Sequence, residues 1–154
     1  MKKNYHTNVN RFVNALERLD TDKIYLQAVR ELSEMALDLN RFQLYAEGID
    51  STERSLGQYS ESTKRRKRAK GDEYGHITLR DTGSFQDKFF LDAKSIPVFI
   101  DSKDQKTSIL EQKYGPKILG LTPSNTEEFK IEVMKLYKQK VHQKIEDLKE
   151  KILQ

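Results

Sequence analysis

The hydrophobic positions between residues 8 and 48 recur at α-helical spacing. Asp20-Thr21-Asp22 supplies N-cap and first-turn chemistry that separates two helices, and Gly48 is a natural C-cap for the second one. The apolar positions of the first helix are Val9, Phe12, Val13, Leu16 and Leu19. Those of the second are Ile24, Ala28, Leu32, Met35, Leu39, Phe42 and Ala46. We therefore predict a short amphipathic helix followed by a longer helix with one continuous apolar stripe.

Residues 49–121 have a different pattern, with every glycine except Gly48 and short apolar runs in place of a helical stripe. The run at 77–79 predicts a strand, and the runs at 89–93 and 96–100 predict a β-hairpin whose tight turn is Lys94-Ser95. Because Pro97 cannot donate to a β-ladder, its strand should begin there or lie at an edge.

Two short helices are expected in the same block. Asp81-Thr82-Gly83 is typical of a turn, in which Gly83 permits a positive φ, and a short helix should begin there. A second short helix is predicted over 104–114, ending at Tyr114-Gly115-Pro116.

Residues 122–154 predict one long helix. Thr122-Pro123 places proline at the first helical position, and Ser124 with Glu127 offers an alternative capping box. The helical stripe consists of Phe129, Val133, Tyr137, Val141, Ile145, Leu148 and Ile152. A helix of about 30 residues is about 45 Å long, so its distal half should lie on another helix or on another subunit.

The fold class that follows is α+β: N-terminal helices, a small antiparallel sheet with a β-hairpin, and a long C-terminal helix. We expect one domain over 1–154, divided into a helical block (8–48), a mixed block with the sheet (49–121) and the long helix (122–154). Charged residues make up 34% of the chain, against about 25% in typical domains. Long helices projecting from a small core, or assembly into a ring, accommodate that much charge most easily.

The net charge is only +4, but basic residues are concentrated at one place. Six of the seven residues at 64–70 are basic: Lys64, Arg65, Arg66, Lys67, Arg68 and Lys70. Such a run can contact nucleic-acid phosphates, which makes binding salt-dependent. It is also typical of a solvated helix face or a mobile loop that is charged for solubility. Base-specific readout is not expected, because no helix-turn-helix, zinc or aromatic stacking module accompanies the run.

No catalytic, cofactor or metal motif emerges from the sequence. Cysteine is absent, and the three histidines lack the spacing of metal ligands. Asp81-Thr82-Gly83 matches the triplet of aspartic proteases, which need two carboxylates sharing a proton. Too few residues separate the strand at 77–79 from the last helix for that all-β fold, so we interpret the triplet as a turn. We expect no enzyme, no cofactor and no metal.

No run of apolar residues reaches the ~18–20 needed to span a membrane. The first residues lead into no apolar run of the signal-peptide type. We therefore expect neither membrane insertion nor secretion by that route.

The middle block resembles a known family. The order LRDTGSF at 79–85, two apolar strands and then Tyr114-Gly115 is similar to the tail-completion or neck proteins of tailed bacteriophages, also termed virion-morphogenesis proteins. The segment at 57–60, followed by the basic run, is similar to variants in phages of Bacteroidetes hosts. The segment at 115–123 resembles their lead into a C-terminal helix. The resemblance covers residues 55–130.

The resemblance implies an α+β fold and a structural virion protein, a ring-forming subunit of the head–tail connector. Its partners would be copies of itself and the portal, adaptor and tail proteins, and assembly would take place in the host cytoplasm. A basic loop would suit a channel through which DNA passes, with non-specific DNA contact. The alternative is a small basic nucleic-acid-binding regulatory protein that uses the 64–70 run.

Overall fold

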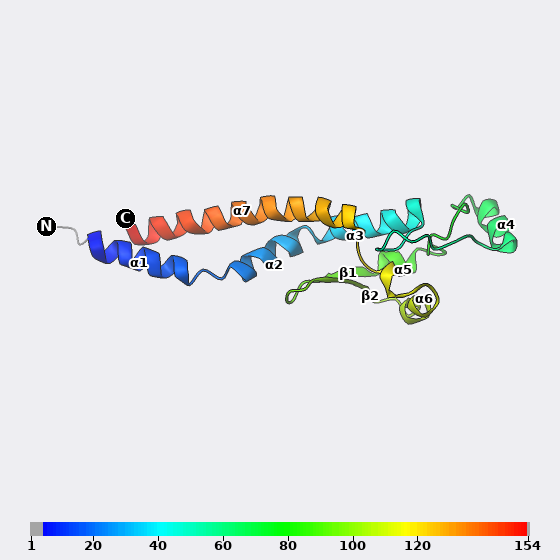
Figure 1. Cartoon of the computed structure of the whole chain (residues 1–154), viewed down its shortest axis with the longest axis horizontal. Coiled ribbons are helices and arrows are strands. Elements are labelled where there is room, and N and C mark those ends of the chain that lie inside the picture. Colours follow the sequence, from blue (N-terminus) through cyan, green and yellow to red (C-terminus); the bar gives the residue numbers. More distant parts are fainter. Residues whose placement is uncertain (1–4, 154) are drawn as a thin grey trace.

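The computed structural model describes residues 5–153, which form an elongated body built along one long helix (Figure 1). Helix α7 (Pro123–Leu153) runs alongside α1 (Tyr5–Glu17) and α2 (Thr21–Glu31) and packs against both. Both ends of the described chain lie at the same end of the body. The distal half of the long helix therefore rests on another helix of the same chain, one of the two arrangements predicted for it.

The two helix starts predicted from cap residues are confirmed. The side chain of Asp20 accepts a hydrogen bond from the Lys23 amide at the start of α2. Helix α7 begins with Pro123, and the Thr122 hydroxyl oxygen accepts from the Asn125 amide. Both caps satisfy backbone donors that a helix start leaves without a partner.

The prediction of one long helix over 21–48 is wrong. The helix breaks at Leu32, where φ is −103° and ψ is 13°, and continues as α3 (Ser33–Phe42) and a π-helical turn (Gln43–Glu47) that ends at Gly48. The physical reason is that the side chains of residues 21–48 pack into two separate hydrophobic clusters. Residues of α2 pack against Val133 of α7 and Ala93, whereas Leu37 and Leu44 pack in a second cluster with residues of the mixed block.

The wider π-helical turn changes which side chains face inward. Phe42, expected in the apolar stripe, is 59% exposed. The neighbouring Gln43 is fully buried, and its amide bonds to the Gly120 carbonyl and the Thr122 amide. These bonds join the end of the helical block to the segment that leads into α7.

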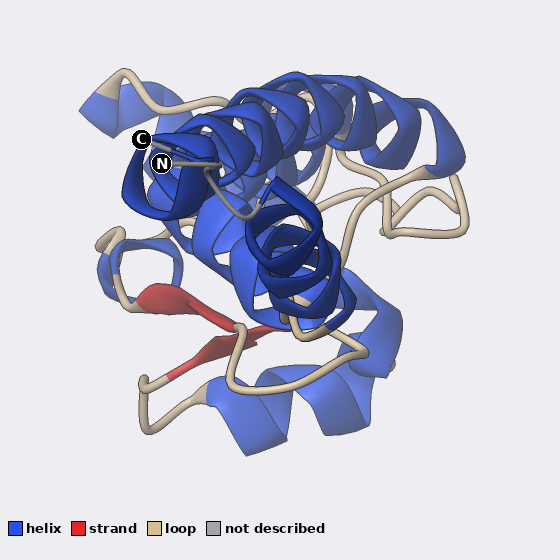
Figure 2. Ribbon diagram, turned by 90° about the vertical axis from the view of Figure 1, so that its left-hand side faces the viewer, coloured by secondary structure: helices blue, strands red, loops and turns tan. Residues whose placement is uncertain are grey.

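The antiparallel hairpin is present, but the second strand begins later than predicted. Strand β1 (Phe89–Asp92) pairs with β2 (Phe99–Ser102), with Phe89 opposite Ser102 and Asp92 opposite Phe99. The predicted two-residue turn is replaced by a longer loop over 93–98. Pro97 lies in this loop because it has no N–H for the ladder, so pairing starts only at Phe99. The two strands lie below the long helices, and a short helix lies below the strands in turn (Figure 2).

The strand predicted at 77–79 is absent from the described part of the chain. The segment is buried but has no strand partner. Its amides are bound individually: the Ile77 amide donates to the Gly57 carbonyl and the Thr78 amide to the Tyr59 hydroxyl oxygen. Leu79 adopts a positive φ of 53°, which is incompatible with a regular strand.

Three short helices complete the mixed block: α4 (Glu61–Lys70), α5 (Ser84–Asp87) and α6 (Thr107–Tyr114). A 3₁₀ turn (Pro116–Ile118) precedes the approach to α7. The predicted helices at Thr82-Gly83 and over 104–114 correspond to α5 and α6. With seven helices and a two-stranded antiparallel sheet among the described residues, the α+β class is confirmed. Within residues 5–153, no helix is both long and apolar enough to cross a membrane.

Candidate functional site: a basic cleft beside α4

The basic run forms most of helix α4, which lies at the end of the body opposite the termini (Figure 1). Ser60 caps its start by accepting from the Thr63 amide, and Gly71 ends it in the left-handed conformation with φ at 75°. Two good caps hold a ten-residue helix whose sequence, apart from Ala69, contains no apolar residue.

The structure divides the six basic residues predicted to bind nucleic acid. Arg65, Arg66, Arg68 and Lys70 are exposed, with the Arg68 guanidinium 4.7 Å from the centre of the Tyr74 ring. Lys64 is partly covered and forms an ion pair with Glu61 at 3.2 Å. The remaining residue, Lys67, is buried.

Lys67 fastens α4 to the rest of the chain. Only 3% of the residue is exposed, and its ammonium donates to the Arg80 carbonyl oxygen at 2.6 Å. The same ammonium lies 5.0 Å from the centre of the Tyr59 ring, within range of a cation–π contact. The basic run is therefore not uniformly solvated, because the Lys67 side chain points into the protein.

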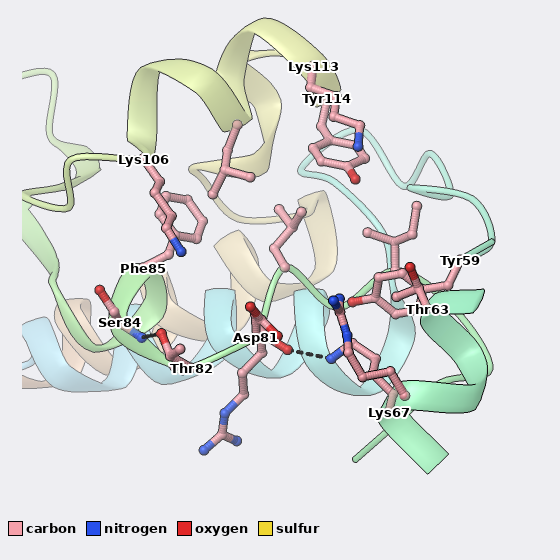
Figure 3. Close-up of a pocket in the computed structure, with 16 residues that line it drawn as sticks. Tyr59, Thr63, Lys67, Asp81, Thr82, Ser84, Phe85, Lys106, Lys113 and Tyr114 are labelled. Atoms are coloured by element: carbon pink, nitrogen blue, oxygen red, sulfur yellow. Dashed lines mark hydrogen bonds between the residues drawn. The ribbon is translucent and has the colours of Figure 1, made fainter. Parts of the chain in front are cut away.

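A cleft of about 290 Å³ lies between α4, the 79–85 turn and α6 (Figure 3). Its floor is apolar and includes Ile77, Leu79, Phe85 and Leu110. The cleft is also lined by two tyrosines and by three aliphatic hydroxyl side chains, which are Tyr59, Tyr114, Thr63, Thr82 and Ser84. The described residues lining it also include cationic side chains from three separate segments: Arg66, Lys67, Arg80, Lys106 and Lys113.

The Asp-Thr-Gly triplet forms one wall of this cleft. Gly83 has a φ of 90°, as its place in the turn predicted, and the Ser84 amide donates to the Thr82 hydroxyl oxygen. Asp81 is exposed at the cleft, and among the described lining residues it is the only carboxylate. The triplet therefore acts as the connection into α5, and it holds one negative charge among several positive ones.

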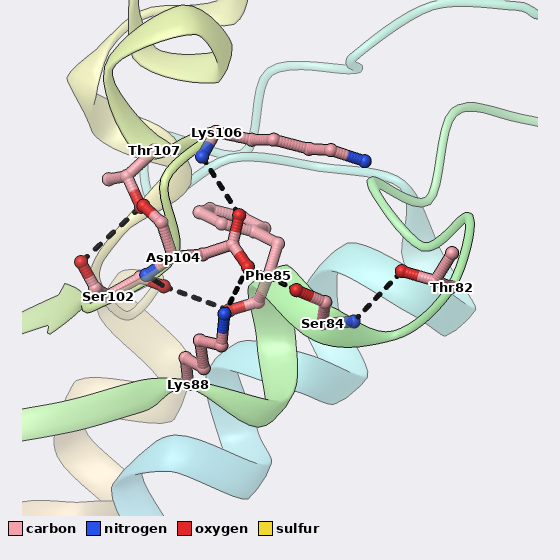
Figure 4. Close-up of polar contacts among 8 residues, drawn as sticks. All are labelled: Thr82, Ser84, Phe85, Lys88, Ser102, Asp104, Lys106 and Thr107. Carbon is pink, nitrogen blue, oxygen red and sulfur yellow. Dashed lines mark hydrogen bonds and ion pairs between the residues drawn. The ribbon is translucent and has the colours of Figure 1, made fainter.

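A second carboxylate, Asp104, lies outside the cleft lining and connects the turn at Ser84 to the start of α6 (Figure 4). It accepts from the Ser84 hydroxyl, from the Lys106 amide at 2.9 Å and from the Lys88 ammonium at 3.1 Å. These bonds, led by that from Ser84, lower the pKa of Asp104 to about 2. Asp104 thereby fixes the 82–84 turn against the start of α6, where Lys106 extends towards the cleft.

The arrangement suits the binding of an anion. Positive side chains converge from α4, from the turn and from α6, and the Thr63 and Thr82 hydroxyls supply neutral hydrogen-bond donors. Lys106 and Lys113 are exposed, so their ammonium groups can reorient towards a ligand. The apolar floor favours an anion that also carries a hydrophobic or aromatic part.

Sequence reasoning found the α4 wall but missed Lys106 and Lys113. The run at 64–70 is visible as composition, whereas these lysines are about 40 residues away in a segment with ordinary charge spacing. A helical reading of 104–114 places Lys106 and Lys113 seven residues apart, two turns along one face. That spacing was the available signal.

Among the described residues, no three His, Asp or Glu side chains are grouped so that they could hold a metal ion. No protein-family model matches this chain, and the comparisons with curated proteins and with solved structures give no match either.

Proposed function

We propose that this chain is a structural virion protein: a ring-forming neck or tail-completion subunit of the head–tail connector of a tailed phage. The sequence resemblance over 55–130 supports this role, and so does the α+β architecture that the resemblance implied. In this role the chain binds further copies of itself and the neighbouring portal, adaptor and tail proteins.

The observation that carries the proposal is the apolar surface on the hairpin. Phe99 is 60% exposed and Ile96 is 54% exposed, at the end of a two-stranded hairpin that runs along the side of the body. Large apolar side chains that are exposed three residues apart on one hairpin are typical of a surface that another protein covers. In a ring, the adjoining subunit covers it, through contacts between two different patches of the same chain.

The exposed side of α4 supplies the DNA contact of this proposal. Arg65 and Lys70 are exposed on a capped helix at one end of the body. Cations on an exposed helix bind phosphates without reading the bases. The logarithm of the DNA-binding constant falls as the logarithm of the salt concentration rises, and each lost phosphate contact makes this negative slope shallower by about 0.9 for duplex DNA. Changing both residues to Gln should therefore make the slope shallower by up to about 1.8, as measured by fluorescence anisotropy.

Assembly is tested by sedimentation velocity and native mass spectrometry of the purified chain. We expect a closed oligomer that Phe99→Glu dissociates. Phe42→Glu is the matched control, because Phe42 is 59% exposed and is the last residue of α3, outside the hairpin. A wild-type chain that is monomeric or dimeric over the micromolar range, with steep salt-dependent DNA affinity, would instead favour the small basic nucleic-acid-binding regulatory protein.

A further inference from the structure

We infer that the cleft between α4 and α6 is a binding site for one nucleotide unit, with the phosphate held by Arg66, Lys106 and Lys113. This inference goes beyond the connector role, and it does not depend on ring formation. The phosphate belongs either to a free nucleotide or to a nucleic-acid strand, and both present the same chemistry to the cleft.

The charge on the cleft favours a phosphate over a neutral ligand. Of its five cationic side chains, Lys67 is committed to the Arg80 carbonyl. Arg80 is exposed, but its guanidinium lies 5.1 Å from the centre of the Tyr45 ring, which is outside the cleft lining. Arg66, Lys106 and Lys113 are exposed at the cleft, and the Lys113 ammonium lies 5.1 Å from the centre of the Tyr114 ring, which lines the cleft. Arg66 belongs to α4, whereas Lys113 belongs to α6 and Lys106 directly precedes it, so a phosphate between them is contacted from both walls. Phosphate oxygens form short, charge-assisted hydrogen bonds with such groups.

The floor of the cleft favours a phosphate that carries a ring. Ile77, Leu79, Phe85 and Leu110 offer an apolar surface, and the tyrosines add aromatic walls with polar ends. The volume of about 290 Å³ lies at the lower limit of small-ligand pockets, which span roughly 300–1,000 Å³. This volume limits the occupant to about one nucleotide unit. A cleft with the same cationic side chains but no apolar floor would instead favour inorganic phosphate.

A substitution of Asp81 tests the inference by an increase in nucleotide affinity instead of a loss. Its carboxylate lies in the same cleft and repels a phosphate. Asp81→Asn removes one negative charge without changing the shape of the side chain, so we expect it to tighten nucleotide binding several-fold. A variant that merely damages the fold cannot produce tighter binding.

The experiment is calorimetric titration of the full chain at low salt with four probes: dAMP, deoxyadenosine, inorganic phosphate and a 5′-hydroxyl oligothymidylate. We expect dAMP to bind more tightly than deoxyadenosine or phosphate. Lys106→Gln with Lys113→Gln should weaken it by about tenfold or more, because hydrogen bonds to charged groups are the strong ones. The matched control is Lys138→Gln with Lys144→Gln, which removes the same charge from exposed positions of α7 outside the cleft lining.

The outcomes separate the two sources of the phosphate. Cleft-dependent binding of dAMP assigns the site to a free nucleotide, and cleft-dependent binding of the oligonucleotide alone assigns it to a strand. Equal weakening by the cleft pair and the control pair overturns the inference, as does phosphate binding as tightly as dAMP. Since no exposed residue of α4 or the hairpin is altered, this result is independent of the tests of assembly and of DNA contact by α4.

Discussion

Lys67→Met tests whether the buried lysine docks α4 onto the body. Methionine keeps most of the apolar stem but removes the ammonium that donates to the Arg80 carbonyl at 2.6 Å. A hydrogen bond involving a charged group contributes about 1.5–3 kcal/mol, and the cation–π contact with Tyr59 adds about 0.5–1 kcal/mol. The relief of burying a charge offsets part of this sum. We therefore expect the free energy of unfolding to fall by about 1–3 kcal/mol.

The assay is urea unfolding followed by circular dichroism at 222 nm. With an m value of about 2 kcal/mol/M, the midpoint should fall by about 0.5–1.5 M. Lys70→Met is the matched control: it makes the same chemical change on the same helix at an exposed position. A surface change of this kind should alter the free energy of unfolding by about 0.5 kcal/mol or less. Equal midpoints for the two variants would refute a docking role for Lys67.

Three further changes test the turns and the polar contacts of the fold. Gly83→Val should cost about 1–2 kcal/mol in urea unfolding, because φ is 90° there; an unchanged midpoint would contradict that conformation. Gly48→Ala should cost about 2–4 kcal/mol, since its Cβ would lie 2.3 Å from the His76 ring as well as at positive φ. Asp104, with its pKa lowered to about 2, stabilises the fold fully above its unfolded pKa of about 3.9. That stabilisation is lost as the pH falls towards 2, so Asp104→Asn should be less stable than wild type at pH 6, and the two unfolding free energies should converge between pH 4 and 2. Parallel pH curves would contradict this.

The elements predicted most accurately from the sequence are those fixed by local chemistry. Asp20 and Thr122-Pro123 mark helix starts because a cap acts within one turn of the chain. Gly83 was placed correctly because an Asp-Thr-Gly turn needs a positive φ. These signals require no knowledge of distant segments.

The error over 21–48 comes from contact between segments far apart in the chain. The stripe over 24–46 is periodic, but no local signal shows that its first half faces α7 and its second half faces the mixed block. The break at Leu32 follows from that division. The error in the hairpin is local: the apolar run predicts a strand from residue 96, but Pro97 has no N–H for the ladder, and pairing begins beyond it, at Phe99.

The candidate site was predictable only in part, for the same reason as the break at Leu32. Composition identifies α4, but it cannot distinguish Lys67 from the exposed Arg65 and Arg68. Only the position of the Arg80 carbonyl makes one cation structural. The opposite wall, with Lys106 and Lys113, depends on how α6 folds back towards α4.

The way α4 is held explains why the cleft is basic. A helix normally docks through an apolar stripe, and α4 contains no apolar residue larger than Ala69. Its inward contact is the Lys67 side chain, whose methylene stem is buried while its ammonium binds a carbonyl. The helix can therefore carry cations on its remaining faces without losing its attachment, and Arg66 lines the cleft from α4 while Arg65 faces solvent. An apolar residue in place of Lys67 would remove positive charge from the cleft wall and weaken the docking together, so the charge of the site and the stability of α4 depend on the same residue.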